Sequence, residues 1–286
     1  MTLHGAAPEF PNDPAPGVLN SFTGDVWING THANASSAGR ATLETGQEIS
    51  THEGMAELLL TPGSFLRLGS GSILRLESLS ASDVRLRLKQ GRAIVEVLIP
   101  RPAIIMEQSG VMAAFQKSGL YGFDKGRGEI AVYSGEARLS RSGKQLLADQ
   151  GFGVKTRRFR EVRVAANSTD RVIAWSNLRS EQLSSESAAS AQSATNGSGW
   201  HWDPWAGSYT WLSASGAVTG PFGWPYYSPG YVPNSIPVHR GDSYLYGPPV
   251  IQNPGIGQSA TPDYTRPAPT VPLTAPGVPQ FPNNKF

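Results

Sequence analysis

The side chains of this sequence that could do chemistry are five histidines, one serine–lysine pair and two neighbouring glutamates. The histidines, at positions 4, 32, 52, 201 and 239, lack the paired spacing that metal sites use. Ser142 and Lys144 lie in a turn-like run where short polar residues are common, so a nucleophilic pair is not favoured. Glu53 and Glu57 would stand about 13 Å apart on an extended strand, too far for paired carboxylates, and a solvated strand face is predicted instead.

These patterns predict a protein that is not an enzyme and that carries no cofactor or metal. The sequence has no cysteine, which excludes disulfides, thiol catalysis and cysteine-bound zinc. Two glycine-rich runs, residues 122–128 and 151–156, lack the strand–loop–helix context of a phosphate loop and are interpreted as hairpin turns. A hydrolase whose catalytic groups follow no recognisable pattern is kept as a remote alternative.

One candidate site is a cluster of basic side chains: Lys155, Arg157, Arg158, Arg160 and Arg163. An aromatic residue, Phe159, stands among them, so the cluster could bind a polyanion by charge and stacking. The favoured alternative is an edge strand whose charges discourage pairing with another sheet. The whole chain has a net charge of only +2, and no nucleic-acid partner is expected.

The stronger candidate site is an aromatic segment that begins at residue 200. Five of the seven tryptophans lie there, separated by glycine and proline. Such rings either pack over the core of their own chain, which is the favoured interpretation, or contact a sugar or an apolar partner surface. The candidate contact residues are Trp200, Trp202, Trp205, Trp211, Trp224, Tyr226 and Tyr227.

Short strands must position these groups. Apolar and polar residues alternate through residues 55–96, and turn residues recur every eight to twelve residues as far as residue 166. This rhythm predicts an all-β fold, built as a sandwich, a barrel or a short solenoid. The charged side chains expected on its solvated face are Arg67, Arg75, Arg85 and Arg87.

A single amphipathic helix is predicted after the strands, over residues 167–190. Ser168 or Thr169 is the expected N-cap, and Val172 and Leu183 lie on the apolar stripe.

The remaining segments contain few periodic patterns. The expected organisation is a flexible leader (1–19), a β domain (20–166), the helix (167–190), a linker (191–199), an aromatic Gly/Pro-rich extension (200–233) and a disordered Pro-rich tail (234–286). Neither a signal peptide nor a membrane-spanning segment is expected from the pattern of apolar residues.

Five pieces of the β domain carry a family likeness: GDVWING (24–30), LETGQEIST (43–51), AELLLTPGSFLRL (56–68), VRLRLKQGRA (84–93) and IAVYSGEA (130–137). On these pieces the β domain resembles the FecR domain over residues 20–156, about half of the chain. The helix and the aromatic segment resemble those of extracytoplasmic FecR-domain proteins of unassigned function.

This resemblance implies an all-β sensing or protein-interaction module outside the cytoplasm, in the periplasm of a bacterium or elsewhere in its envelope, with a protein or another envelope component as its partner. The sequence lacks the anti-sigma segment of the best-known members, so regulation of a sigma factor is not carried over. The alternative function is binding of carbohydrate or peptidoglycan by the aromatic segment, residues 200–227.

Overall fold

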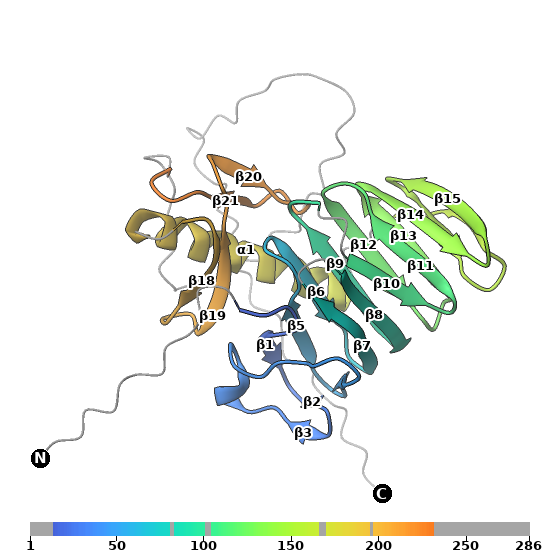
Figure 1. Cartoon of the computed structure of the whole chain (residues 1–286), viewed down its shortest axis with the longest axis horizontal. Coiled ribbons are helices and arrows are strands. Elements are labelled where there is room, and N and C mark those ends of the chain that lie inside the picture. The colour runs from blue at the N-terminus through green and yellow to red at the C-terminus, as the bar shows by residue number, and fades with distance from the viewer. Residues whose placement is uncertain (1–13, 81–82, 101–103, 166–169, 195–196, 232–286) are drawn as a thin grey trace, which may run out of the picture. The chain divides into compact units, whose positions relative to one another are not determined.

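The computed structural model describes residues 14–80, 83–100, 104–165, 170–194 and 197–231. These residues form two large sheets, one α-helix and two short hairpins (Figure 1). The predicted Pro-rich tail and most of the predicted leader lie outside the described residues, as do both expected N-cap residues, Ser168 and Thr169.

Each large sheet combines strands from the whole length of the β region. The eight-stranded sheet has the order β1 (Leu19–Thr23), β5 (Met55–Leu59), β6 (Ser64–Leu68), β9 (Arg92–Val97), β12 (Gly119–Asp124), β13 (Glu129–Ser134), β16 (Phe152–Lys155) and β17 (Arg160–Arg163). The nine-stranded sheet has the order β15 (Lys144–Asp149), β14 (Glu136–Arg141), β11 (Val111–Phe115), β10 (Ile104–Gln108), β8 (Asp83–Gln90), β7 (Ser72–Ser80), β4 (Glu48–Thr51), β2 (Val26–Ile28) and β3 (Thr31–His32).

The chain crosses repeatedly between the two sheets, and it mostly forms two neighbouring strands in one sheet before it crosses to the other. Thus β5 and β6 are followed by β7 and β8 in the other sheet, and the same alternation runs from β10 to β17. Gly91 makes one crossing, with a φ of +77°, and a Cβ there would stand 2.3 Å from Ser72 Oγ. Only glycine fits that position without strain. The all-β prediction is confirmed, in its sandwich form.

The two sheets pack face to face because apolar and polar side chains alternate along their strands. Leu58, Leu66 and Val95 of the eight-stranded sheet share one buried core with Leu74 and Leu86 of the nine-stranded sheet. The outer face of the nine-stranded sheet carries charges instead, including Arg75 and Arg87. This division follows from the period-two pattern of each strand.

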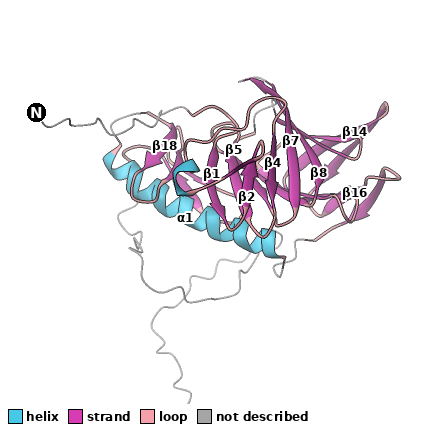
Figure 2. Cartoon of the chain, turned by 90° about the horizontal axis from the view of Figure 1, so that it is seen from below, coloured by secondary structure: helices cyan, strands magenta, loops and turns pink. Residues whose placement is uncertain are grey.

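Helix α1 (Arg171–Ser193) covers part of the opposite outer face, that of the eight-stranded sheet, where it contacts β6 and β9; it lies beneath the strands in Figure 2. Asp170 caps the helix, because its side chain accepts a hydrogen bond from the backbone N–H of Val172 at 3.1 Å. The buried side of α1 includes the predicted Val172 and Leu183, but most of the other positions are small and polar. They are Ser176, Ser180, Ser184, Ser187 and Ser190.

Two hairpins follow the helix: β18 (Gly199–Asp203) with β19 (Ser208–Leu212), and β20 (Ala217–Thr219) with β21 (Pro225–Tyr227). Strands β19 and β21 contact α1, and β19 also contacts β1. Among the described residues, no helix is long and apolar enough to cross a membrane.

Candidate functional site

A buried cluster of charged side chains lies where α1 meets the eight-stranded sheet. Glu57, Arg67 and Glu96 project from the adjacent strands β5, β6 and β9, and all three are fully buried. Arg67 Nε lies 2.7 Å from Glu57 Oε2, and Arg67 Nη1 lies 2.7 Å from Glu96 Oε2. The predicted solvated positions of Glu57 and Arg67 are therefore wrong.

Helix α1 completes this cluster from the other side. Arg179 Nη2 lies 2.9 Å from Glu57 Oε1, and Ser180 Oγ donates to Glu96 Oε2 at 2.5 Å. The amide of Asn20, on β1, donates to Glu57 Oε1 at 2.9 Å. Two carboxylates thus face two guanidinium groups, and the formal charges of the four side chains sum to zero. The small serine side chains of α1 let the helix approach this polar face closely.

Electrostatics favour the charged forms of Glu57 and Arg67. Burial by itself would raise the pKa of Glu57, but the charges of Arg179 and Arg67 outweigh that effect and lower the pKa to about 2. Burial likewise opposes the charge on Arg67, yet Glu57 and Glu96 raise its pKa. Because each charge depends on its partners, the cluster fixes α1 in one position on the sheet.

A sequence signal for this cluster exists. Glu57 interrupts an otherwise apolar run, residues 55–60, and such runs are typical of strands buried on both faces. The period-two interpretation missed it because that pattern assumes one solvated face. Arg179 gave no signal, since its partner is 122 positions away in the sequence.

Most of the candidate aromatic contact residues lie inside the molecule. Trp200, Trp211 and Tyr226 pack with Phe65 and Leu59 in a second core between the hairpins and the sheet. The ring centroids of Phe65 and Trp200 are 5.3 Å apart, and those of Trp211 and Tyr226 are 5.9 Å apart. Tyr227 is buried as well, in a smaller cluster at the C-terminal end of α1. These four rings present no surface to a ligand.

Trp202 and Trp224 are partly buried. The ring of Trp202 packs against Tyr209, with centroids 5.0 Å apart, and closely against Gly39, where a Cβ would stand 2.2 Å from it. Trp224 Nε1 donates to the side chain of Asn177 on α1 at 2.9 Å. Both rings therefore help to hold the hairpins in place.

Trp205 differs from all the other described tryptophans, since 97% of its surface is exposed. It lies in the loop between β18 and β19, next to the exposed Pro204 and Ala206. Asp203 orders this loop, because its Oδ1 accepts hydrogen bonds from the backbone N–H groups of Trp205 at 2.8 Å and of Ala206 at 3.2 Å. The loop thus presents a large apolar ring to solvent in an ordered setting.

The candidate basic cluster lies at the edge of the eight-stranded sheet, on β16, β17 and their connecting turn. Lys155 is paired with Glu129 at 2.7 Å, and the guanidinium of Arg163 lies 5.3 Å from the ring centroid of Phe152. Arg157, Arg158 and Arg160 are exposed. Phe159 is partly buried and packs against the core between the sheets.

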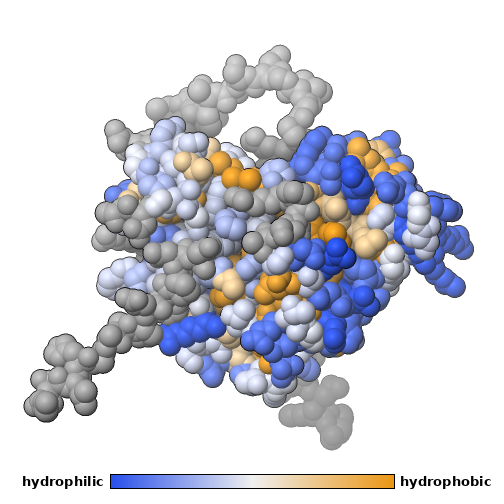
Figure 3. Space-filling view, in the orientation of Figure 1, coloured by the Kyte–Doolittle hydropathy of each residue, from blue (hydrophilic) through white to orange (hydrophobic). Residues whose placement is uncertain are grey.

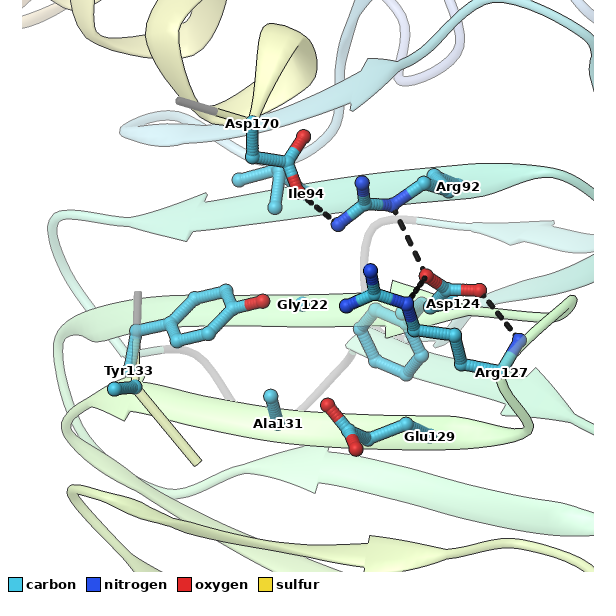
Figure 4. A pocket seen from close by; sticks show the side chains of 11 residues that line it. Arg92, Ile94, Gly122, Asp124, Arg127, Glu129, Ala131, Tyr133 and Asp170 are labelled. Carbon is cyan, nitrogen blue, oxygen red and sulfur yellow. Dashed lines mark hydrogen bonds and ion pairs between the residues drawn. The ribbon is translucent and has the colours of Figure 1, made fainter. Parts of the chain in front are cut away.

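A small polar hollow lies on the outer face of the eight-stranded sheet, beside the N-terminus of α1 (Figure 4). Arg92 bridges Asp170 at the helix cap and Asp124 on β12, the latter at 3.2 Å. The ring of Tyr133 lies over Gly122, and burial raises the pKa of its hydroxyl to about 12. Through Arg92, the N-terminus of α1 is therefore tied to the sheet at a second place, besides the buried cluster of charged side chains.

Comparisons with known proteins give a weak likeness to solved structures. No family model matches the chain, and no curated protein matches it. Two crystal structures of a candidate anti-sigma factor from Parabacteroides distasonis ATCC 8503, at 1.65 and 2.50 Å resolution, each align with 14% identity and a TM-score of 0.37. Each alignment covers 46% of this chain and 64% of the other, so this chain spans less than two thirds of those proteins.

Proposed function

We propose that this chain is a FecR-type protein-interaction module of the bacterial cell envelope, without catalytic activity, and that the β18–β19 loop makes the contact. The observation that carries the proposal is the 97% exposure of Trp205 on a loop ordered by Asp203. The Asp203 hydrogen bonds hold the backbone of the loop, and a tryptophan side chain with only two rotatable bonds loses little conformational entropy when a partner binds it. Tryptophan is also enriched among binding hot spots. The envelope location rests on the sequence resemblance alone.

A protein partner is favoured over a glycan because of how the aromatic rings are distributed. Trp200, Trp211, Tyr226 and Tyr227 are enclosed by their own chain. One exposed tryptophan beside Pro204 and Ala206 forms a compact apolar tip that suits a pocket in a protein. Stacking of the same ring on a sugar is the alternative.

Site-specific photo-crosslinking in the native host tests this proposal. A photoreactive amino acid replaces Trp205 in one strain and Met112 in another, since Met112 is also exposed, at 44%, but lies on β11 of the other sheet. We expect one discrete adduct with another protein from position 205 and none from position 112. The same products from both positions, or no product from either, would overturn the proposal.

A sedimentation assay with purified peptidoglycan separates the alternative function. Under the proposal, neither the natural chain nor Trp205→Ala co-sediments with it. Binding of the natural chain that Trp205→Ala abolishes would favour the carbohydrate alternative instead. Binding that both chains retain would exclude Trp205 as the glycan contact.

A further inference from the structure

The two large sheets have four edge strands, and three of them are poor sites for further strand pairing. β1 contains an irregularity at Leu19/Ser21, and its Asn20 side chain binds the backbone of Tyr209 on β19. β3 has only two residues. Three of the four residues of β17 are charged, Arg160, Glu161 and Arg163, and such charges discourage pairing.

The fourth edge strand, β15, is longer and regular, and its charged residues, Lys144 and Asp149, stand only at its two ends. Its six residues pair with β14 in unbroken register, and none of them is glycine or proline. No other described strand pairs with it. Leu147, in its middle, is 51% exposed, although the surface around β14 and β15 is largely hydrophilic in Figure 3. A regular, open edge with an exposed leucine is a site where another strand adds readily.

The geometry of the β14–β15 turn determines which groups of β15 point outward. Arg141 and Lys144 are paired across a two-residue turn in which Ser142 and Gly143 have φ values of +47° and +80°. Such a turn is closed by a hydrogen-bonded pair, and the hydrogen-bonded pairs then alternate along the ladder. The backbone N–H and C=O groups of Gln145, Leu147 and Asp149 therefore face away from β14.

We propose that β15 pairs with β15 of a second copy of this chain, antiparallel and about a two-fold axis at Leu147. In this register Leu147 lies opposite Leu147 of the second copy, and Gln145 lies opposite Asp149. All three outward-facing residues of each strand form ladder pairs, and no two like charges lie directly opposite each other. The pairing also places Leu146 opposite Ala148, which extends the core between the sheets across the axis.

The strand is complementary to itself, and this is the reason to prefer a second copy to another partner. A charged partner strand would gain little from electrostatic pairing, because Asp149 is the only charged residue among the three that face outward. One strand per copy buries less surface than the roughly 1,200–2,000 Å² of a standard stable interface, so a reversible, concentration-dependent dimer is expected.

Single cysteines provide a direct test, because the natural chain contains none. Residues opposite each other in a hydrogen-bonded antiparallel pair have Cα atoms about 5.5 Å apart, within the range that a disulfide spans. Under mild oxidation, Leu147→Cys should crosslink to itself. Gln145→Cys and Asp149→Cys should each stay largely monomeric alone but crosslink when mixed. Equal crosslinking by all three single variants would contradict the proposed register.

A second test, by analytical ultracentrifugation of the full chain, requires no oxidation. Leu147→Pro removes an outward N–H and leaves the donors of the β14–β15 ladder in place, so loss of the dimer with an unchanged circular dichroism spectrum is expected. Leu147→Thr keeps the backbone donors and should weaken the dimer less. If the natural chain stays monomeric up to its solubility limit, or if Leu147→Pro dimerises as well as the natural chain, the proposal is wrong.

Discussion

Two arginines in similar sequence settings have opposite environments. Arg67 and Arg75 both stand between two leucines, on β6 and β7, which are consecutive in the sequence but belong to different sheets. Arg67 is fully buried between two carboxylates, whereas the side chain of Arg75 is 41% exposed and lies 3.3 Å from Glu48. The difference arises because α1 covers one sheet and no described element covers the charged face of the other in the same way.

Substitution of these two arginines by methionine should therefore have very different effects. Arg67→Met leaves Glu57 and Glu96 buried with fewer partners, and we expect it to lower the free energy of unfolding by about 3–5 kcal/mol. Arg75→Met removes an ion pair that water already screens, at a cost of less than about 1 kcal/mol. Urea denaturation measures both values, and similar losses would show that the buried cluster has no special role.

The environment of the Glu186 carboxyl group can also be tested, through the effect of pH on stability. It lies between α1 and the β18–β19 hairpin, where Ser208 Oγ donates to it at 3.0 Å. Burial raises its pKa from 4.5 to about 7, despite the opposing effect of Arg179. A carboxyl group with a raised pKa in the folded state takes up protons on folding, so stability falls as the pH rises from about 4.5 to 7.

Glu186→Gln should remove that part of the pH dependence and stabilise the chain above pH 7, because the amide oxygen can still accept from Ser208. The matched control is Glu181→Gln, an exposed position on the same helix. Melting temperatures of the three proteins across this pH range provide the measurement. An unchanged pH profile for Glu186→Gln would contradict the assigned environment.

At the scale of elements, α1 packs against both the eight-stranded sheet and the two hairpins, which also contact the sheet directly. It contacts the sheet through Arg179 and Ser180 and the hairpins through Leu183 and Ser184. Apolar contacts alone are not directional and would allow several positions of the helix on its sheet. The buried charges and hydroxyls give it one defined position.

Tryptophan substitutions distinguish the packing role of the hairpins from the proposed binding role. Trp211→Ala should lower the free energy of unfolding by about 3–5 kcal/mol, because it empties a buried position. Trp205→Ala should change it by less than about 0.5 kcal/mol and affect only partner binding. Thermal melts of both variants test this, and a large loss of stability in Trp205→Ala would remove the basis for treating its loop as a binding element.

At the scale of the whole molecule, the two hairpins that pack on the eight-stranded sheet should contribute to the stability of the sandwich. Removal of residues 200–286 takes away Trp200, Trp211 and Tyr226, which cover Phe65 on β6. We expect a marked fall in melting temperature. A chain that ends at Tyr231 is the control, since the composition of residues 234–286 predicts no packing. If the longer deletion leaves the melting temperature unchanged, the hairpins do not stabilise the sheet.

The sequence by itself determined the all-β fold, the turns and the helix, because strand alternation and turn glycines are local properties. It placed the helix N-cap at Ser168 or Thr169, whereas the structure has Asp170 in that role. The sequence also located the aromatic segment. For the basic cluster it offered two interpretations, and one of them, an edge strand, matches the position of the cluster in the sheet. The tertiary structure decided which groups surround the buried charges. Arg67 and Arg179 have ordinary sequence neighbours, and their burial depends on a helix that returns more than a hundred residues later to cover the sheet. The same return of the chain encloses Trp200 and Trp211 and leaves Trp205 exposed, since a ring's exposure is set by what packs against it.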